Sequence, residues 1–412
     1  MTHPLTPPCA LLLRRLPRPA EKWIESIFRR LIQRWRFGGL KIRFADGHQL
    51  TAGNPQATEW AIIDVHDRNF LTRVLVRGEM GAGESFVAGE WSSPHLVVTL
   101  RLFLRNLEAL DIENSLTQLA RLPARLRHLS RLNNRRGSES NIHAHYDLGN
   151  DFYRLFLGES WAYSCGYWRT GAKSLEQAQQ AKIDRLIKML KLDANDHLLE
   201  IGCGWGTLAI RAAQTTGCRV TAITVSRQQY ELASKRVADC GLTNRVEIRY
   251  CDYRDVSGRF SKIVSVEMIE AVGYEFLDEF FQLCAERLAP GGRVALQSIT
   301  IPDYKFDDYR RSIDWTQLYI FPGSLIPSIG ALASSSSKAR LELERLDNIG
   351  VDYVPTLKEW RRRFKQSLTQ VRELGFDDSF IRLWDLYLSF SQAAFAECSL
   401  SDIHVLFHKA KI

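Results

Sequence analysis

The sequence contains no apolar run of the roughly 20 residues that a helix needs to cross a bilayer. Prolines and arginines interrupt its apolar N-terminal stretch, ALLL, so we expect neither a signal peptide nor a transmembrane anchor. The eight cysteines form no CxxC pair and have no regular spacing, which argues against a disulfide framework and against a zinc site. We therefore expect reduced thiols, no metal centre and a cytoplasmic location.

Basic charge is distributed unevenly along the 412 residues, a length sufficient for two or three domains. Residues 1–140 hold 21 Lys and Arg against 13 Asp and Glu, whereas the remainder holds 34 of each. The whole net charge of +8 therefore lies on the N-terminal third. Clustered positive charge favours an acidic partner there, either anionic lipid or nucleic acid.

A basic amphipathic helix is predicted near the N-terminus, from Trp23 to Trp35. Apolar residues recur on one face, and Arg29, Arg30 and Arg34 are among the basic residues on the remainder. Such a helix can lie on a membrane, or its apolar face can pack on its own domain. Short strands are expected next, at 40–44 and 61–65, followed by helices at 70–77 and 96–110. Glycines at 78, 81, 83 and 89 separate the two helices.

A second arginine-rich stretch, Arg121–Arg136, leads into the polar segment RGSESN. Its arginines fit either a solvated helix face or contacts to lipid phosphates. We place a linker at residues 133–141, which gives a basic, membrane-associating N-terminal domain at 1–132 and a second domain at 142–412.

Strands and helices alternate in the second domain, which predicts an α/β doubly wound sheet. A largely helical segment, Tyr304–Arg345, interrupts the alternation, and a helix at Phe380–Phe395 precedes the last strand. The expected strands are Leu198–Ile201, Val220–Val225, Val246–Tyr250, Ile263–Val266, Val294–Ile301 and Ile403–Phe407, and the helices between them are Thr207–Thr215, Gln228–Cys240 and Tyr274–Leu288.

The most informative stretch is Leu198–Leu208, LLEIGCGWGTL, in which an apolar strand runs into three alternate glycines and then a helix. Strand, glycine turn and helix is the pattern of a nucleotide-type cofactor site. A dinucleotide site would have an acidic residue about 20 positions further on, where this chain reads ITVSRQQ. No GxxxxGK[ST] segment is present either, so we expect a cofactor without a pyrophosphate.

The order of motifs then resembles S-adenosylmethionine-dependent methyltransferases, and more narrowly the cyclopropane-fatty-acyl-phospholipid synthase family. The general resemblance rests on EIGCGWG, ITVSRQQ, CDYRD, VEMIEAVG and LAPGGRVALQSI. The narrower one rests on HYDLGNDFYRLFLG, YSCGYW, SLEQAQQAK and YIFPG. It covers residues 141–412 strongly and the N-terminal third weakly. It implies a seven-stranded Rossmann-like methyltransferase sheet with a helical insertion, and a smaller α+β N-terminal domain.

The resemblance also assigns residues to S-adenosylmethionine. Tyr163 and Ser164 would contact the cofactor, and Tyr253 and Arg254 would border the adenine unless they are plain surface. The glycines of the turn would face the methionine and ribose portion, and neutral residues would replace the ribose-binding acid: Gly202, Gly204, Gly206, then Thr224, Val225 and Gln229.

In this family a bound bicarbonate acts as the base, and the resemblance maps its holders onto Cys165, Glu270, Tyr353 and the backbone of Ile299. An anion beside Glu270 implies a carboxyl that is protonated or that shares a proton. Each side chain also has a purely structural reading: a buried thiol, a helix cap and a packed aromatic.

Two positions near these residues differ from many bacterial members of the family, which have His where this chain has Ala271 and Gln297. Gln297 offers only a neutral amide, so we expect anion binding to remain but proton release to differ. Ser391 replaces a further Cys. A plant-like branch looks similar to this chain at both His positions.

The expected reaction adds a methylene across the cis double bond of an unsaturated acyl chain in membrane phospholipid, forming a cyclopropane fatty acid. The alternative is a C-methyltransferase that acts on the same acyl group and gives a methyl-branched or exomethylene product. A non-catalytic lipid-binding protein is a weaker alternative. Nucleic-acid methylation is disfavoured by the VEMIEAVG segment. The family suggests a homodimer at the inner face of the cell membrane.

Overall fold

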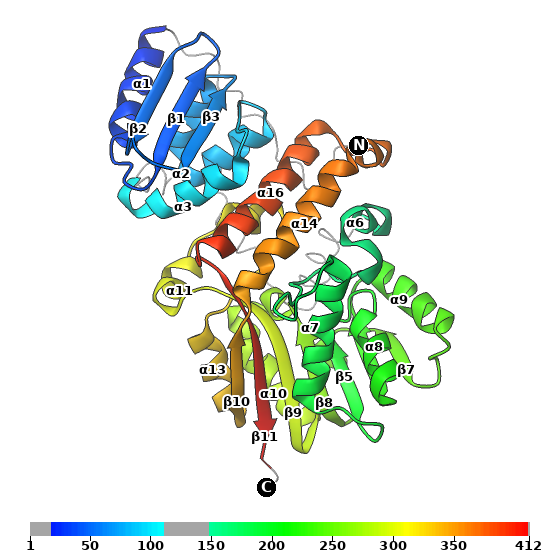
Figure 1. Ribbon diagram of the computed structural model, residues 1–412. Coiled ribbons are helices and arrows are strands. Elements are labelled where there is room, and N and C mark those ends of the chain that lie inside the picture. Colours follow the sequence, from blue (N-terminus) through cyan, green and yellow to red (C-terminus); the bar gives the residue numbers. More distant parts are fainter. Residues whose placement is uncertain (1–17, 111–147, 411–412) are drawn as a thin grey trace. The chain divides into compact units, whose positions relative to one another are not determined.

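The computed structural model describes residues 18–110 and 148–410 (Figure 1). Contacts divide the chain into two compact units. Unit 1 holds the described N-terminal residues together with Ser312–Ile320 and Phe364–Ser399, and unit 2 holds the rest. Unit 1 therefore includes two segments that lie within the predicted range 142–412. The predicted linker and the arginine-rich stretch before it fall outside the described residues.

Unit 1 is built on a small sheet with strand order β2-β1-β3-β4, in which β1 and β3 are parallel. The other two pairings are antiparallel. Its elements are α1 (Arg18–Ile32), β1 (Gly39–Phe44), β2 (Gln49–Gly53), β3 (Trp60–Val65), α2 (Asn69–Val87), β4 (Trp91–Ser92), α3 (Leu96–Leu110), α12 (Trp315–Tyr319), α15 (Leu368–Glu373) and α16 (Asp378–Ala396).

The apolar face of α1 packs within its own unit. Phe28 is 4% exposed and meets Phe70 edge to face at 5.9 Å between ring centroids. Trp35, just beyond the helix, meets Phe103 in the same way at 5.1 Å. Of the two readings of this helix, these contacts show the packed one, although Trp23 at its start stays 67% exposed.

The glycines after residue 77 do not end the helix, contrary to expectation. Helix α2 runs through them to Val87 and is interrupted only at Gly78, whose φ of 58° and ψ of −135° are not helical. Gly83 is explained by close packing, because a Cβ there would lie 2.5 Å from the Trp315 indole. The glycines thus serve helix packing and one kink rather than a loop.

Unit 2 contains a seven-stranded sheet with order β10-β11-β9-β8-β5-β6-β7. The pairs from β9 through β7 are parallel, and β11 is antiparallel to both of its neighbours. Its strands are β5 (His197–Ile201), β6 (Arg219–Thr224), β7 (Val246–Tyr250), β8 (Phe260–Val266), β9 (Leu288–Thr300), β10 (Leu341–Asn348) and β11 (Ser401–Lys409).

Helices cover this sheet on both sides (Figure 1), which confirms the doubly wound α/β architecture. The helices of the unit are α6 (Asn150–Leu157), α7 (Leu175–Leu190), α8 (Thr207–Thr216), α9 (Arg227–Asp239), α10 (Leu277–Arg287), α11 (Asp303–Tyr309), α13 (Ile329–Lys338) and α14 (Tyr353–Gln366), the last of which runs into unit 1. The expected strands are present. The expected helical segment ends early, because β10 begins at Leu341.

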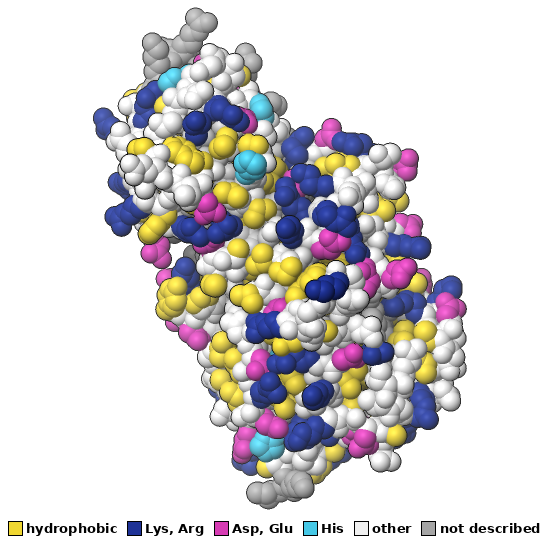
Figure 2. Space-filling model, in the orientation of Figure 1, with side chains coloured by type: hydrophobic (Ala, Val, Ile, Leu, Met, Phe, Trp, Pro, Cys, Tyr) yellow, Lys and Arg dark blue, Asp and Glu magenta, His cyan; other side chains and the backbone are white. Residues whose placement is uncertain are grey.

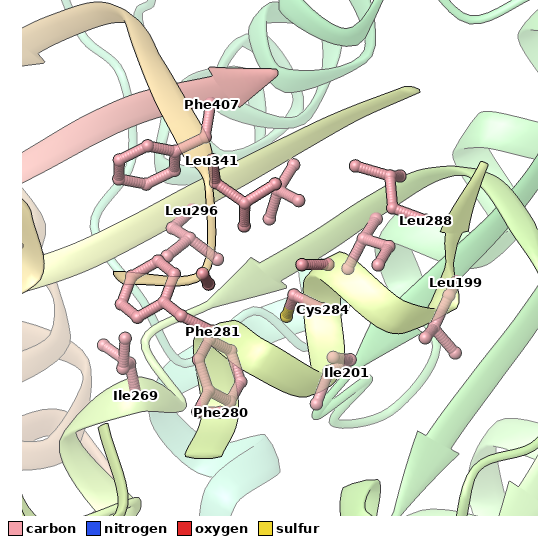
Figure 3. Close-up of a cluster of buried hydrophobic side chains, with 14 of the residues drawn as sticks. Leu199, Ile201, Ile269, Phe280, Phe281, Cys284, Leu288, Leu296, Leu341 and Phe407 are labelled. Atoms are coloured by element: carbon pink, nitrogen blue, oxygen red, sulfur yellow. The ribbon is translucent and has the colours of Figure 1, made fainter. Parts of the chain in front are cut away.

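Two apolar clusters pack against opposite faces of the central strand β5. On one side Leu199 and Ile201 pack with Phe280 and Phe281 of α10 (Figure 3). On the other side Leu198 packs with side chains of α7 and α8. Because β5 is buried on both faces, the position of the glycine turn that follows it is fixed.

The surface of unit 2 carries both signs of charge. Figure 2 shows acidic side chains among the basic ones on its visible face. In the part of the protein that the structure describes, no helix combines the length and the apolar character needed to span a membrane.

Candidate active site

A cavity of about 170 Å³ opens at the carboxyl ends of β5, β6, β7 and β8. Ligands of open α/β sheets bind at this edge of the sheet. Of the predicted cofactor residues, Gly206 and Arg254 lie outside the lining, and eight lie in it: Tyr163, Ser164, Gly202, Gly204, Thr224, Val225, Gln229 and Tyr253.

The three glycines of the turn all have left-handed backbone conformations, with φ of 79°, 52° and 79° at Gly202, Gly204 and Gly206. A Cβ on Gly202 would lie 2.6 Å from the Met268 side chain. Gly206 stands at the N-cap of α8, so its place in the turn is structural. The backbone here takes a path that favours glycine, and that path forms one wall of the cavity.

Neutral groups occupy the end of β6, as the sequence predicts for the ribose side. The Thr224 hydroxyl donates to Oε1 of Gln229 at 2.9 Å, and Ser226 caps α9. Arg254 turns away and binds both oxygens of Asp252, at 2.8 and 2.7 Å. Arg254 thus positions Asp252, which lines the cavity beside Tyr253.

A buried lysine supports the loop that carries Tyr163 and Ser164. Lys182, on the buried face of α7, donates to Oγ of Ser164 at 2.7 Å. Gln179, one turn earlier, donates to the Ser164 carbonyl at 2.6 Å. Burial lowers the pKa of Lys182, and the nearby carboxyls, Glu267 first among them, oppose that effect.

Glu267 joins the cavity to the residues predicted for catalysis. It follows β8, lines the cavity, and holds the left-handed φ of 47° that is uncommon outside glycine. Its Oε1 accepts from the Cys165 backbone N–H and from Nε2 of Gln297, both at 2.8 Å. Its Oε2 accepts from the Tyr353 hydroxyl. Three of the five predicted catalytic residues therefore meet at one carboxylate that the sequence analysis did not name.

A second buried carboxyl lies beside this one. Nε2 of Gln297 also donates to Oδ2 of Asp402 at 2.8 Å, and Oε1 of Gln297 faces Nε2 of His404 at 3.2 Å. Nε of Arg185 donates to Nδ1 of His404, which leaves the His404 proton on Nε2. Burial lowers the pKa of His404 well below its usual range, so the ring is a neutral donor.

The two remaining predicted residues form a separate pair. Oε1 of Glu270 accepts from the Ile299 backbone N–H at 2.6 Å and from the Ser298 hydroxyl at 3.0 Å. Its Oε2 is buried and has no hydrogen-bond partner among the described residues. Burial, and then the charge of Glu267, raise the pKa of Glu270 to about 8, so it is protonated at neutral pH. The Cys165 thiol is also neutral, because burial raises its pKa well above the usual range.

This geometry does not fit the expected bicarbonate. The Cys165 N–H and the Tyr353 hydroxyl bind Glu267, and the Ile299 N–H binds Glu270. The protein's own carboxylates therefore take the donors that the resemblance assigns to the anion. An added anion would also be repelled by the neighbouring Glu267 carboxylate.

Sequence reasoning missed Glu267, Asp252, Lys182, Asp402 and His404. Glu267 directly follows β8, and Asp252 lies two residues after β7. Because ligands bind at the carboxyl ends of parallel strands, these positions could have predicted both residues. Lys182 stands on the apolar face of α7, where a charged residue is unusual. Asp402 and His404 lie in the last strand, and only the pairing of β11 with β9 brings them to Gln297.

Comparison with known proteins agrees with this fold. The cyclopropane synthase MmaA2 from Mycobacterium tuberculosis superposes with a TM-score of 0.62 at 25% identity, over 66% of this chain and 98% of that one. The mycolic acid cyclopropane synthase CmaA1, solved with SAH and CTAB, gives 0.62 at 26% identity, over the same shares. The fold and cofactor cavity define an S-adenosylmethionine-dependent methyltransferase.

The relatives narrow this class. The tuberculostearic acid methyltransferase UfaA1 of M. tuberculosis is 39% identical over 86% of this chain and 84% of its own length. The cyclopropane-fatty-acyl-phospholipid synthase of Escherichia coli K12 is 33% identical over 85% and 88%. The mycolic acid cyclopropane synthetase family matches residues 133–405, and the protein belongs to that family.

Proposed function

We propose that the protein transfers a one-carbon unit from S-adenosylmethionine to the cis double bond of an unsaturated acyl chain in membrane phospholipid, and closes it to a cyclopropane. The observation that carries the proposal is the position of Glu267, which lines the cofactor cavity and gathers Cys165, Gln297 and Tyr353. The cavity proposed for the methyl donor and the buried acid–base cluster therefore meet at Glu267.

The chemistry explains why both parts are needed. The sulfonium methyl is electrophilic, and its transfer to the alkene releases S-adenosylhomocysteine and leaves a carbocation on the acyl group. A proton must then leave the new methyl group for the ring to close. A dry site that tolerates a cation and contains a base meets these demands.

Aromatic rings support the cationic step. Trp161, Tyr163 and Trp205 line the cavity. The Trp161 and Trp205 rings lie 5.4 Å apart between centroids, and the Tyr153 ring contacts both Tyr163 and Trp205. A ring face stabilises a cation by about 0.5–2 kcal/mol. Three such rings would favour the carbocation over its capture by water.

The alternative is a C-methyltransferase in which the same carbocation loses a proton elsewhere or accepts a hydride, giving an exomethylene or methyl-branched product. The similarity to a protein named as a methyltransferase favours it, whereas the similarity to the E. coli synthase favours the ring. The two readings share the first step and differ only in how the cation is resolved.

The substrate implies a membrane partner. An acyl group in a bilayer is reached from the surface, and the basic N-terminal third suits an anionic one. We therefore propose peripheral association with the inner face of the cell membrane in the cytoplasm, and a homodimer as in the resemblance above. No nucleic-acid partner is part of this proposal.

The decisive experiment is incubation with methyl-labelled S-adenosylmethionine and vesicles of unsaturated phospholipid, followed by NMR of the extracted acyl groups. Cyclopropane methylene protons support the proposal, and vinylic or simple methyl protons support the alternative. If calorimetry detects no S-adenosylmethionine binding, a non-catalytic lipid-binding protein replaces both.

A further inference from the structure

Glu267 is the acidic residue through which the buried cluster reaches the cofactor cavity. Cys165, Gln297, Glu270, Ile299 and Tyr353 all lie outside the cavity lining. Glu267 lies within it, and three of those five residues donate to its two oxygens. Its left-handed backbone costs on the order of 1 kcal/mol for a residue with a Cβ, and such strain concentrates at functional positions.

The three donors define a seat for a planar oxyanion. A backbone N–H, an amide N–H and a phenol converge on the two oxygens of one carboxylate. Bicarbonate presents the same planar pair of oxygens, and these donors overlap with those assigned to it by resemblance. Here the seat is filled from within the protein, by a side chain three residues before Glu270.

The series of hydrogen bonds behind Gln297 keeps this seat in one orientation. His404 donates to Oε1 of Gln297, so the amide must turn its N–H groups toward Glu267 and Asp402. A neutral amide suffices there, since the anion is covalently tethered and needs no extra positive charge to be captured. This accounts for Gln at a position where many bacterial members of the family have His.

Charge in the cluster leaves Glu267 as the group that can accept a proton. Burial and the neighbouring Glu267 raise the pKa of Asp402 well above its usual range, so Asp402 keeps its proton. Burial raises the pKa of Glu267 as well, while the Tyr353 and Cys165 donors and the Lys182 ammonium lower it. A hydrogen bond between the two carboxyls requires one proton, and the donor set assigns that proton to Asp402.

We propose that Glu267 is the base of this enzyme and replaces an external bicarbonate. This rests on the function proposed above. After the alkene π pair has formed the new C–C bond, a Glu267 oxygen takes a proton from the transferred methyl. The C–H electron pair then bonds to the cationic carbon and closes the ring. Glu267 is left as a neutral carboxylic acid, and no further reactant is needed.

The test compares Glu267→Gln, Glu267→Gly and Glu270→Gln with the full-length wild type, in buffer freed of carbon dioxide. The wild type should form cyclopropane at the same rate with and without added bicarbonate. Glu267→Gln should lose about 100-fold or more in kcat, the usual contribution of a general base. Glu270→Gln is the matched control: Glu270 is already protonated, and an amide oxygen can accept from Ile299 and Ser298, so its loss should be far smaller.

Glu267→Gly vacates the seat and suits the left-handed backbone, so it should fold. Its activity should rise at least about tenfold on adding formate or bicarbonate. NMR of carbon-13-labelled formate and bicarbonate should detect binding to Glu267→Gly loaded with S-adenosylhomocysteine, and not to the wild type.

Three results would overturn the proposal: a wild type that needs bicarbonate, labelled anion bound equally by wild type and Glu267→Gly, or equal losses in the two Gln variants. The binding measurement needs no turnover. A wild type that makes no lipid product would therefore remove the proposed function, while the binding result still decides which carboxylate or anion occupies the seat.

Discussion

Gln297 shows how one neutral residue can organise two buried acids. Its Nε2 donates to both Glu267 and Asp402, and its Oε1 is held by His404. Each carboxyl gains a donor without a positive charge between them, so their mutual repulsion remains and keeps one protonated. Gln297 therefore contacts both acids, although its side chain does not line the cavity.

Replacing Gln297 with Leu keeps the volume and removes both N–H groups. Glu267 then loses one of three donors to its charged form, so its pKa rises. We expect product formation to fall about tenfold or more, because a buried Glu267 oxygen loses a hydrogen bond that stabilises its charged form. The acid limb of the rate–pH profile should move to higher pH. A change in rate with an unmoved pH profile would mean that Gln297 acts only in packing.

Glu200 makes stability depend on pH. Burial raises its pKa from 4.5 to about 8, so the folded protein binds a proton that the unfolded protein has released between those values. Stability should therefore fall as pH rises from about 4.5 to about 8, by up to about 1.4 kcal/mol per pH unit from this group. Glu200→Gln should flatten that slope in urea unfolding measured at pH 5, 7 and 9. A variant with an unchanged slope would show that Glu200 is ionised when folded.

At the level of elements, the sequence identifies the parallel strands well because they are apolar runs bounded by turns. Val246–Tyr250 is predicted to the residue. β10 is missed because LELERLDN is charged at half of its positions, and as an edge strand it needs only β11 as a partner. The membership of α16 in unit 1 has no local signal at all, since it depends on contacts distant in sequence.

The candidate site also combines local features, which the sequence predicts, with contacts between distant residues, which it does not. The glycine turn and the residues at strand ends are local features, so most of the predicted cofactor residues do line the cavity. Arg254 lies outside the lining, and its guanidinium binds Asp252, two residues away. Cys165 contacts Glu267 through its backbone N–H, a contact that no residue type can signal.

The glycine turn offers a test with an internal control, because α8 has left-handed glycines near both ends. Gly204 lines the cavity with φ 52°, and Gly217 caps the far end with φ 75°. Alanine at either position should cost about 1–2 kcal/mol of stability. Only Gly204→Ala should weaken S-adenosylmethionine binding in calorimetry, because its Cβ would enter the space beside the cofactor. Equal affinities in the two variants would place the cofactor elsewhere.

At the level of the whole molecule, the described part of the candidate site lies entirely in unit 2, while the basic excess lies on the N-terminal third. Unit 1 cannot simply be cut away. Its α3 holds Glu397, in the segment after α16, through Arg101 and Arg105 at 2.6 Å each. Removing residues 1–132 would strip this segment of these partners, so charge variants of the full-length protein are the proper probe of membrane contact.

Replacing Arg29, Arg30 and Arg34 with Gln should weaken binding to anionic vesicles. All three are exposed, but Arg29 is paired with Glu25 at 2.9 Å, so its charge is partly offset. Each basic residue near an anionic surface contributes about 1 kcal/mol, which predicts a loss of about tenfold or more for the triple variant.

The matched control replaces Lys188, Arg219 and Arg259, exposed residues of unit 2, with Gln, so that net charge changes equally. Vesicle binding by the two triple variants is measured by sedimentation at low and at physiological salt. Electrostatic binding should weaken at physiological salt, where charges are screened over about 8 Å. Calorimetry should give unchanged S-adenosylmethionine affinity for the unit 1 variant, since its arginines belong to the other unit. If both variants bind vesicles equally, net charge and not this helix attracts the membrane. If neither differs from wild type, the basic third serves another partner.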